Sequence, residues 1–218
     1  MVISLLLHYP IFMKISRLTT LGAFFLLLAT TPGLAETGPI GKIAFITGSA
    51  ESSFSGGTLA NLSEGSPVFS GSKIITHENT AVRILLTDKI AMQLGPNTEI
   101  TLTHPAVRDT RVSLKQGNLM SSVHPLGKRP RFEVRTRSAS MGVRGTTFFV
   151  SESPTKPTFV CICHGTVAVK TQDGETPITS EHHDLPKFVD SKNGKLIAAQ
   201  VGIDHKDEDA AALQKLVE

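Results

Sequence analysis

Large aromatic side chains other than phenylalanine are almost missing from this 218-residue sequence, which has no Trp and a single Tyr. That residue, Tyr9, lies in the N-terminal segment ahead of position 36. Flat stacking platforms for sugars and unpaired bases usually draw on Trp and Tyr. The composition therefore argues against a carbohydrate-binding or single-strand-binding module.

An apolar run long enough to cross a membrane is also missing. The run Leu21–Ala29 has about half of the ~20 apolar residues that a spanning helix needs. It follows a short basic stretch and precedes small residues that end at Ala35, the pattern of a signal peptide. We predict a signal peptide over residues 1–35 and a periplasmic or secreted protein without a transmembrane helix after cleavage. The first 12 residues form an unusual apolar prefix, so Met1 and Met13 are both candidate starts.

The part of the chain that follows the predicted signal peptide has little net positive charge. The whole sequence carries a formal charge of +3, and removal of Lys14 and Arg17 lowers it to +1. Nucleic-acid-binding proteins usually present a strongly basic surface. We therefore predict no nucleic-acid partner.

Helical periodicity is missing from most of the chain. Between Ile40 and about Lys170, apolar and polar residues alternate with a period of two, which is typical of half-buried strands. Clusters of Gly, Pro, Ser and Asn separate these segments. The pattern predicts an all-β domain over residues 36–172. The alternating segments include Ile43–Phe45, Val82–Leu86, Ile100–Leu102, Val112–Leu114, Phe132–Val134 and Val160–Ile162.

Three segments share a spacing in which two alternating apolar residues are followed by two further positions and a glycine. The glycines are Gly48, Gly117 and Gly165. Glycine adopts backbone conformations that let a strand turn sharply. The repeats are too irregular for a strict solenoid. We predict a single twisted β-roll or short β-helix-like domain with glycine corners, with a β-sandwich as the alternative.

The residues after the predicted domain, 173–218, combine a hairpin signal with a helix signal. Asn193-Gly194 is typical of a tight hairpin turn. The last residues are charged and alanine-rich, which favours a short C-terminal helix that is marginal unless it docks.

The segment from Gly41 to about Val169 resembles the FecR-type domain of periplasmic signal transducers and related exported proteins. The resemblance implies an all-β domain outside the cytoplasm that receives a signal. Signal-transducing members also have a cytoplasmic segment that acts on a sigma factor. We expect only the exported module here, because nothing that could fold as such a segment precedes the predicted signal peptide. The matching landmarks are Leu62–Val68, Gly71–Thr76, Ala81–Leu86, Leu94–Ile100, Leu114–Gly117, Val143–Val150 and His164–Val169.

The most specific of these landmarks is Val143-Arg-Gly-Thr146. Gly145 can take a conformation closed to other residues, and Thr146 can bond locally to a turn. Arg144 offers a planar fork for carbonyls or a carboxylate. We interpret Arg144, Gly145 and Thr146 as a structural corner locked by a buried Arg, rather than as a ligand site.

Cys161-Ile-Cys163-His164 is the sharpest candidate for chemistry. On a regular strand Cys161 and Cys163 share one face and His164 lies on the other. Two buried thiols, a disulfide and a metal site completed by His182 and His183 all remain open. The segment supports an alternative function as a metal- or redox-responsive periplasmic protein, although His182 and His183 are more typical of a surface loop.

A basic stretch contains Lys128, Arg129, Arg131, Arg135 and Arg137. If the intervening apolar residues face the core, the arginines line an exposed face. Such a face suits an anionic partner, such as lipid headgroups, a cell-wall polymer or an acidic protein. A charged strand edge that prevents edge-to-edge pairing explains the stretch equally well.

Catalytic patterns are missing as well. The sequence has no Gly-x-Ser-x-Gly elbow, no evident pair of catalytic carboxylates and no phosphate-binding loop. We predict no enzymatic activity and no cofactor. The predicted function is an exported, non-catalytic binding or interaction module, with signalling as one such role. Its predicted partner is an envelope protein or an anionic component of the cell wall or membrane.

Overall fold

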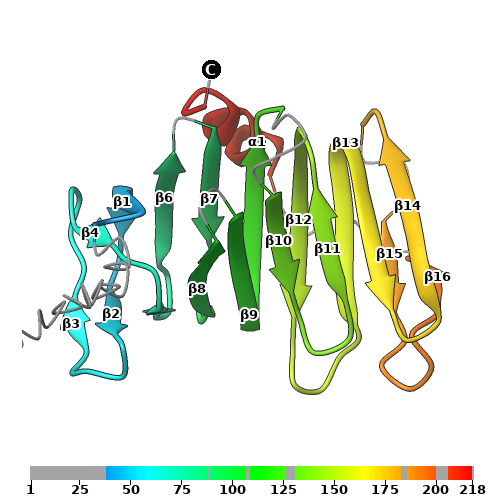
Figure 1. The fold of residues 1–218 in the computed structure, drawn as a ribbon, viewed down its shortest axis with the longest axis horizontal. Helices are drawn as coiled ribbons and strands as arrows, with labels where there is room; N and C mark the ends of the chain where they lie inside the picture. Colours follow the sequence, from blue (N-terminus) through cyan, green and yellow to red (C-terminus); the bar gives the residue numbers. More distant parts are fainter. Residues whose placement is uncertain are drawn as a thin grey trace, which may run out of the picture. The chain divides into compact units, whose positions relative to one another are not determined.

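The computed structural model describes residues 38–87, 89–106, 109–125, 131–182, 186–199 and 206–217. These residues belong to one compact unit, Glu36–Glu218. Its strands stand side by side from β1–β4 to β14–β16, and α1 lies against β7 and β9 (Figure 1). The predicted all-β fold is confirmed.

Two sheets make up the unit. Sheet A contains, in spatial order, β4 (Pro67–Val68), β1 (Gly41–Thr47), β6 (Ala81–Thr87), β7 (Ile90–Leu94), β9 (Asp109–Val123), β12 (Thr146–Glu152), β13 (Thr158–Thr171), β15 (Lys187–Val189) and β16 (Leu196–Ala198). Sheet B contains β3 (Ala60–Asn61), β2 (Ala50–Phe54), β5 (Ser72–Thr76), β8 (Glu99–Ala106), β9, β10 (Arg131–Arg135), β11 (Ser140–Val143), β13 and β14 (Gly174–Ser180). The long strands β9 and β13 belong to both sheets. Neighbouring strands are antiparallel, except that β9 and β10 are parallel.

The main hydrophobic core lies between the two sheets. It combines side chains such as Ile84 of sheet A and Ile100 of sheet B, both fully buried. Phe132 of β10 meets Phe148 of β12 edge to face, with 6.4 Å between ring centroids. The period of two in the sequence is therefore explained by one face of each sheet packing against the other.

The three predicted corner glycines lie where the chain passes from one sheet to the other. Gly48 separates β1 from β2, Gly117 divides β9, and Gly165 divides β13. Their φ angles are +79°, +93° and +99°, a region that other residues rarely enter. The chain thus turns between sheets at glycines, as expected of a roll.

Each corner glycine packs against a buried threonine, namely Thr80, Thr98 or Thr146. In each case the threonine hydroxyl bonds to both the N–H and the C=O of the residue that follows the glycine. The residue before each threonine has a positive φ. Three glycine–threonine corners therefore join the sheets by the same set of bonds.

The short helix α1 (Asp207–Gln214) docks on the outer face of sheet A. Its buried Ala210 and Leu213 share a second apolar cluster with Phe149, Phe159 and Cys161. Arg83 of β6 pairs with Asp209 at 3.5 Å, and Gln214 Nε2 donates to Thr147 Oγ1 at 3.3 Å. Docking supplies the stability that eight residues lack alone. Within the described ranges, no helix has the length and apolarity needed to cross a bilayer.

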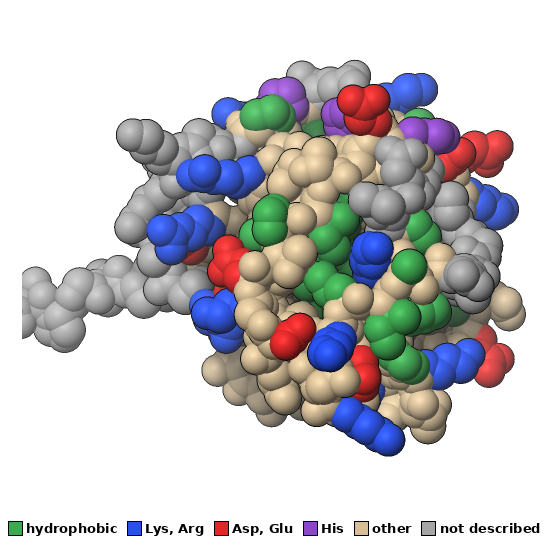
Figure 2. All heavy atoms as spheres, turned by 90° about the vertical axis from the view of Figure 1, so that its right-hand side faces the viewer, with side chains coloured by type: hydrophobic (Ala, Val, Ile, Leu, Met, Phe, Trp, Pro, Cys, Tyr) green, Lys and Arg blue, Asp and Glu red, His purple; other side chains and the backbone are tan. Residues whose placement is uncertain are grey.

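The C-terminal strands extend both sheets past residue 172. Strand β14 pairs with β13 in sheet B, and β15 pairs with β13 in sheet A. The turn between β15 and β16 contains Gly194 with a φ of +74°. Figure 2 shows this end of the unit, where hydrophobic side chains are surrounded by charges of both signs. Ile197 of β16 is 52 % exposed here.

Candidate functional site

A groove of about 690 Å³ crosses the outer face of sheet B, over β9, β10, β11, β13 and β14. Its floor is made of the small residues Ser140, Gly142, Thr166 and Ala168. A Cβ atom added to Gly142 would meet nothing within 4 Å. The depression exists because small side chains on β11 and β13 lie between long side chains on the neighbouring strands.

The strand register places cationic side chains at both ends of this floor. At one end Arg131 of β10 lies beside Arg144, one position beyond the Phe132–Val143 pair. At the other end Arg135 lies opposite Ser140, which in turn lies opposite Lys170. Arg131 and Arg135 are four positions apart on β10, which corresponds to roughly 13 Å along a strand. Each end also holds one carboxylate, because Asp109 pairs with Arg131 and Glu175 pairs with Lys170. The groove is a small-residue floor between two ends at which cations outnumber carboxylates.

Glu133 lies on the groove wall between those ends and is held as a carboxylate. Arg111 Nε donates to Glu133 Oε2 at 2.8 Å, and Arg135 Nε donates to Oε1 at 2.9 Å. The Ser140 hydroxyl also donates to Oε1. Burial opposes ionisation, but these hydrogen bonds outweigh it and lower the pKa of Glu133 to about 2. Glu133 therefore fixes the orientation of two arginines along the wall.

A second cluster, outside the groove, also consists of one carboxylate that binds two cationic side chains. Glu99 of β8 accepts from Lys73 at 2.8 Å and from Lys115 at 3.1 Å. The hydrogen bond from Lys73 is the largest cause of the lowered pKa of Glu99. The groove differs because its lining also contains Arg131, Arg144 and Lys170, together with the carboxylates Asp109 and Glu175.

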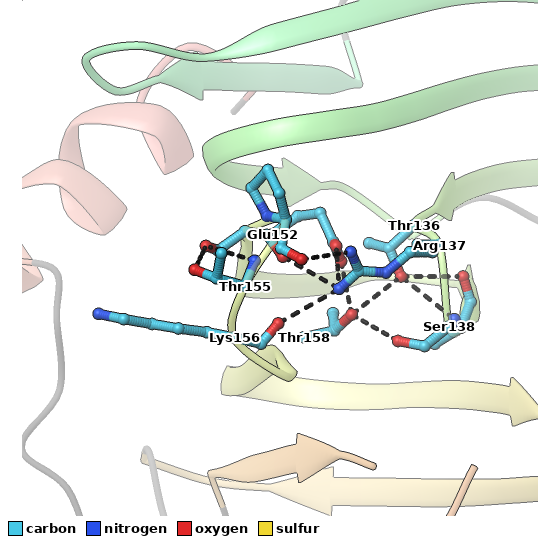
Figure 3. Close-up of polar contacts among 10 residues, drawn as sticks. Thr136, Arg137, Ser138, Glu152, Thr155, Lys156 and Thr158 are labelled. Atoms are coloured by element: carbon cyan, nitrogen blue, oxygen red, sulfur yellow. Dashed lines mark hydrogen bonds and ion pairs between the residues drawn. The ribbon is translucent and has the colours of Figure 1, made fainter. Parts of the chain in front are cut away.

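Arg137 departs from the predicted basic face and instead holds the loop between β12 and β13 (Figure 3). It donates to the carbonyl oxygens of Ser153, Pro154 and Lys156 at 3.0, 2.9 and 3.3 Å. It also lies 3.3 Å from Glu152 Oε1. The sequence could not reveal this role, because the carbonyls come from a loop some 17 residues away. Lys128 and Arg129 of the predicted face lie outside the described residues.

Glu152 is the buried member of this network, with a side chain only 1 % exposed. Its other oxygen accepts from the Thr158 hydroxyl at 2.5 Å, and Thr158 also bonds to Ser138 at 2.6 Å (Figure 3). Burial raises the pKa of Glu152, and the Thr158 bond and the Arg137 charge offset this only in part. Every polar contact of this cluster is internal to the fold, so we assign it a structural role.

The motif Arg144-Gly145-Thr146 lies at a corner between the sheets. The side chain that holds this corner belongs to Thr146 and not to Arg144. Arg144 is exposed on the groove side rather than buried. Thr146 is 2 % exposed and bonds to Thr166 N–H and C=O. Gly145 has a φ of +65°. The motif therefore combines a threonine-locked corner with an arginine that lines the groove.

Cys161 and Cys163 are buried at 0 % and 5 % exposure, and neither forms a disulfide. His164 is exposed, with Nδ1 3.4 Å from the Glu181 carbonyl oxygen, and His182 is exposed as well. His183 lies outside the described residues. Among the residues that the structure describes, no three His, Cys, Asp or Glu side chains converge as metal ligands.

The predicted opposition of His164 to the cysteines is wrong because β13 contains a β-bulge. Thr147 pairs with His164 and Phe148 pairs with Ile162, so Cys163 is an extra residue. Cross-strand partners share a face. His164 therefore lies on the α1 side of sheet A, as Thr147 and Cys161 do.

Comparison with known proteins gives the family of this domain. Residues 72–168 match the FecR protein family. Over these residues the chain has a FecR domain. No curated protein matches the sequence significantly. Within the matched span lie the groove residues Asp109–Ala168 and the corners at Gly117 and Gly165.

Solved structures show the same fold around this FecR domain. Two crystal structures of a candidate anti-sigma factor from Parabacteroides distasonis match with TM-scores of 0.51 and 0.50. Both are 20 % identical to this chain, and each match covers 58 % of this chain and 58 % of the other. At this identity the likeness establishes the fold.

Several groove residues carry no signal that single-sequence reasoning could use. Gly142, Ala168 and Ser140 are common residues whose importance comes from the long side chains around them. A glycine inside a strand pattern does indicate a close backbone approach or an open floor. Gly142 is therefore a floor residue that the sequence could have indicated, in addition to Arg131, Arg135 and Arg144, which the basic stretch and the family motif did indicate.

Proposed function

We propose that this protein is an exported, non-catalytic interaction module whose groove on sheet B binds an acidic, extended segment of an envelope partner. The observation that carries the proposal is the register of the groove. Arg131 and Arg144 lie at one end of the small-residue floor, and Arg135 and Lys170 lie at the other. FecR-family membership supports a signalling-related role for such a module.

The geometry favours an extended peptide over a compact anion. The two ends of the groove are roughly 13 Å apart. In an extended peptide, side chains four residues apart have the same separation and lie on the same face. A single phosphate could reach only one end. The small floor at Gly142 and Ala168 leaves room for a peptide backbone between the two acidic side chains.

The carboxylate of the groove, Glu133, is held by Arg111, Arg135 and Ser140. A carboxylate with a pKa of about 2 is a poor general base at neutral pH. These features support recognition without catalysis. The matched crystal structures are described as those of an anti-sigma factor, which suggests that the partner of this chain is a regulatory protein.

The peptide-binding role is tested with Gly142→Leu. The added side chain has space and an ordinary backbone conformation, so the fold is expected to persist while the floor is filled. The probe is a short extended peptide with two glutamates four residues apart, titrated by calorimetry at low salt. We expect its affinity to fall by about tenfold or more in G142L, since both backbone approach and charge contacts are lost.

Thr101→Leu is the matched control, because Thr101 lies on the outer face of sheet B at β8, outside the groove. It should bind the peptide as the unmodified protein does. A peptide with glutamates two residues apart should bind more weakly than the four-residue spacing. Equal binding by G142L and T101L, or no preference for spacing, would refute the groove as the site.

Export is tested separately, by N-terminal sequencing of the protein recovered from cell fractions. We expect the mature chain to begin at Glu36 and to be found outside the cytoplasm, because residues 1–35 have the pattern of a cleaved signal peptide. Recovery of cytosolic protein that still begins at Met1 or Met13 would contradict export. The peptide experiment would stand unaffected.

A further inference from the structure

The dithiol Cys161–Cys163 lies on the opposite sheet from the groove, and nothing in the proposed function uses it. The chain contains no other cysteine. Cys161 belongs to an apolar cluster that is covered by Ala210 and Leu213 of α1 and by Val217 just beyond the helix. The two thiols are joined by a hydrogen bond. A pair of thiols in contact is thus sealed beneath a short docked helix.

The β-bulge explains how two cysteines on one strand come together. On a regular strand, the side chains of residues i and i+2 run parallel roughly 6.6 Å apart, so a disulfide between them is strained. The bulge at Cys163 breaks that regularity, because Phe148 and Thr147 pair with Ile162 and His164. Bulges bend a strand and re-aim side chains.

We propose that Cys161 and Cys163 are a redox modification site that forms an intrachain disulfide by exchange with a disulfide oxidant, and that docking of α1 controls access to it. The helix is suited to this control because it is short. Its polar contacts with the sheets include one long ion pair, Arg83–Asp209, and one bond from Gln214. Short elements with few contacts open at low free-energy cost.

The docked helix also keeps the thiols unreactive. The hydrogen bond to Cys161, burial and the nearby Asp207 carboxylate all raise the pKa of Cys163, so little of the reactive thiolate exists. Release of α1 would remove both the burial and the Asp207 charge. Reactivity and helix docking are therefore linked.

The exchange proceeds in two steps. Cys163 loses its proton to solvent, and its thiolate attacks one sulfur of glutathione disulfide. That S–S bond breaks, a mixed disulfide forms and one glutathione thiolate leaves. The Cys161 thiolate then attacks the Cys163 sulfur and displaces the second glutathione. The protein loses two protons and two electrons, and the oxidant is reduced to two thiols.

Leu213→Asp tests the proposal, with Ala211→Asp as its matched control. Leu213 is fully buried against sheet A, whereas Ala211 is exposed on the same helix, so both variants add one charge but only the first should undock α1. Reduced mature protein is incubated with glutathione disulfide and followed by mass. We expect L213D to lose two hydrogens at least about tenfold faster than A211D and the unmodified protein.

Two further measurements complete the test. Cys161→Ser in the L213D background should accumulate the glutathione adduct, because the resolving thiol is missing. Alkylation of the thiols by iodoacetamide should be faster in L213D than in A211D, since release of α1 exposes them. Equal oxidation rates of L213D and A211D, or glutathione adducts without an intrachain disulfide in L213D, would overturn the proposal. The outcome is independent of peptide binding in the groove.

Discussion

Replacement of Gly117 by Ala is expected to destabilise the fold by ~4 kcal/mol, enough to lower the thermal midpoint by about 10 °C or more. Gly117 has a φ of +93°, which strains any residue with a Cβ. An added Cβ would also lie 2.4 Å from Thr98 Cα and 2.3 Å from its hydroxyl oxygen. The corner would lose the bonds from Thr98 to Asn118 that join sheet B to sheet A.

Gly65→Ala is the matched control for this prediction. Gly65 has a similar φ of +83°, but a Cβ there would meet nothing within 4 Å. The difference between the two variants isolates the steric clash from the backbone strain. Gly65→Ala should cost only about 1 kcal/mol. Chemical denaturation measures both, and equal losses would mean that close packing at the glycine–threonine corner contributes nothing.

Replacement of Arg137 by Ala is expected to cost ~3 kcal/mol at neutral pH. The variant leaves the Glu152 carboxylate buried without its cation, and it removes donors to three loop carbonyls. Arg135→Ala provides a control with the same 48 % side-chain exposure. Its partner Glu133 is 25 % exposed and keeps Arg111, so R135A should cost less than about 1 kcal/mol.

The pH dependence distinguishes the buried carboxylate from simple loss of packing. The folded-state pKa of Glu152 lies above 4.5, so the folded protein binds this proton more tightly than the unfolded chain. Stability from this group is present below pH 4.5 and is lost as the pH rises through the raised pKa. The cost of R137A should therefore shrink toward pH 4.5, and Glu152→Gln should abolish that trend. A pH-independent cost would assign the effect to the loop bonds alone.

The local features of this protein follow from short stretches of sequence. The alternation around Val112 and Val134 places one side of each strand in the core, because side chains of a strand point to opposite faces. Gly48, Gly117 and Gly165 could be identified as corners because only glycine readily takes their backbone conformation. The threonine partners were less evident, since Asn79-Thr80, Asn97-Thr98 and Gly145-Thr146 look alike only after their bonds are known.

Prediction from sequence failed where a residue's role depends on a distant segment. Arg137 is exposed, as expected of the basic stretch, but the sequence could not show that it donates to carbonyls of the loop after β12. His164 was expected opposite Cys163, yet a pairing shift against β12 puts it on the α1 side. Arg144 was expected to be buried, yet Thr146 closes that corner.

The amino-acid sequence by itself determined that the chain forms alternating strands with glycine corners and resembles a FecR domain. Backbone conformation and side-chain alternation depend on near neighbours, so they can be read locally. Only the tertiary structure decided that Gly142 and Ala168 form a floor between cationic ends, and that α1 covers two touching thiols. Both depend on the register between strands far apart in the chain, and a shift of one residue would turn every side chain of a strand to the other face.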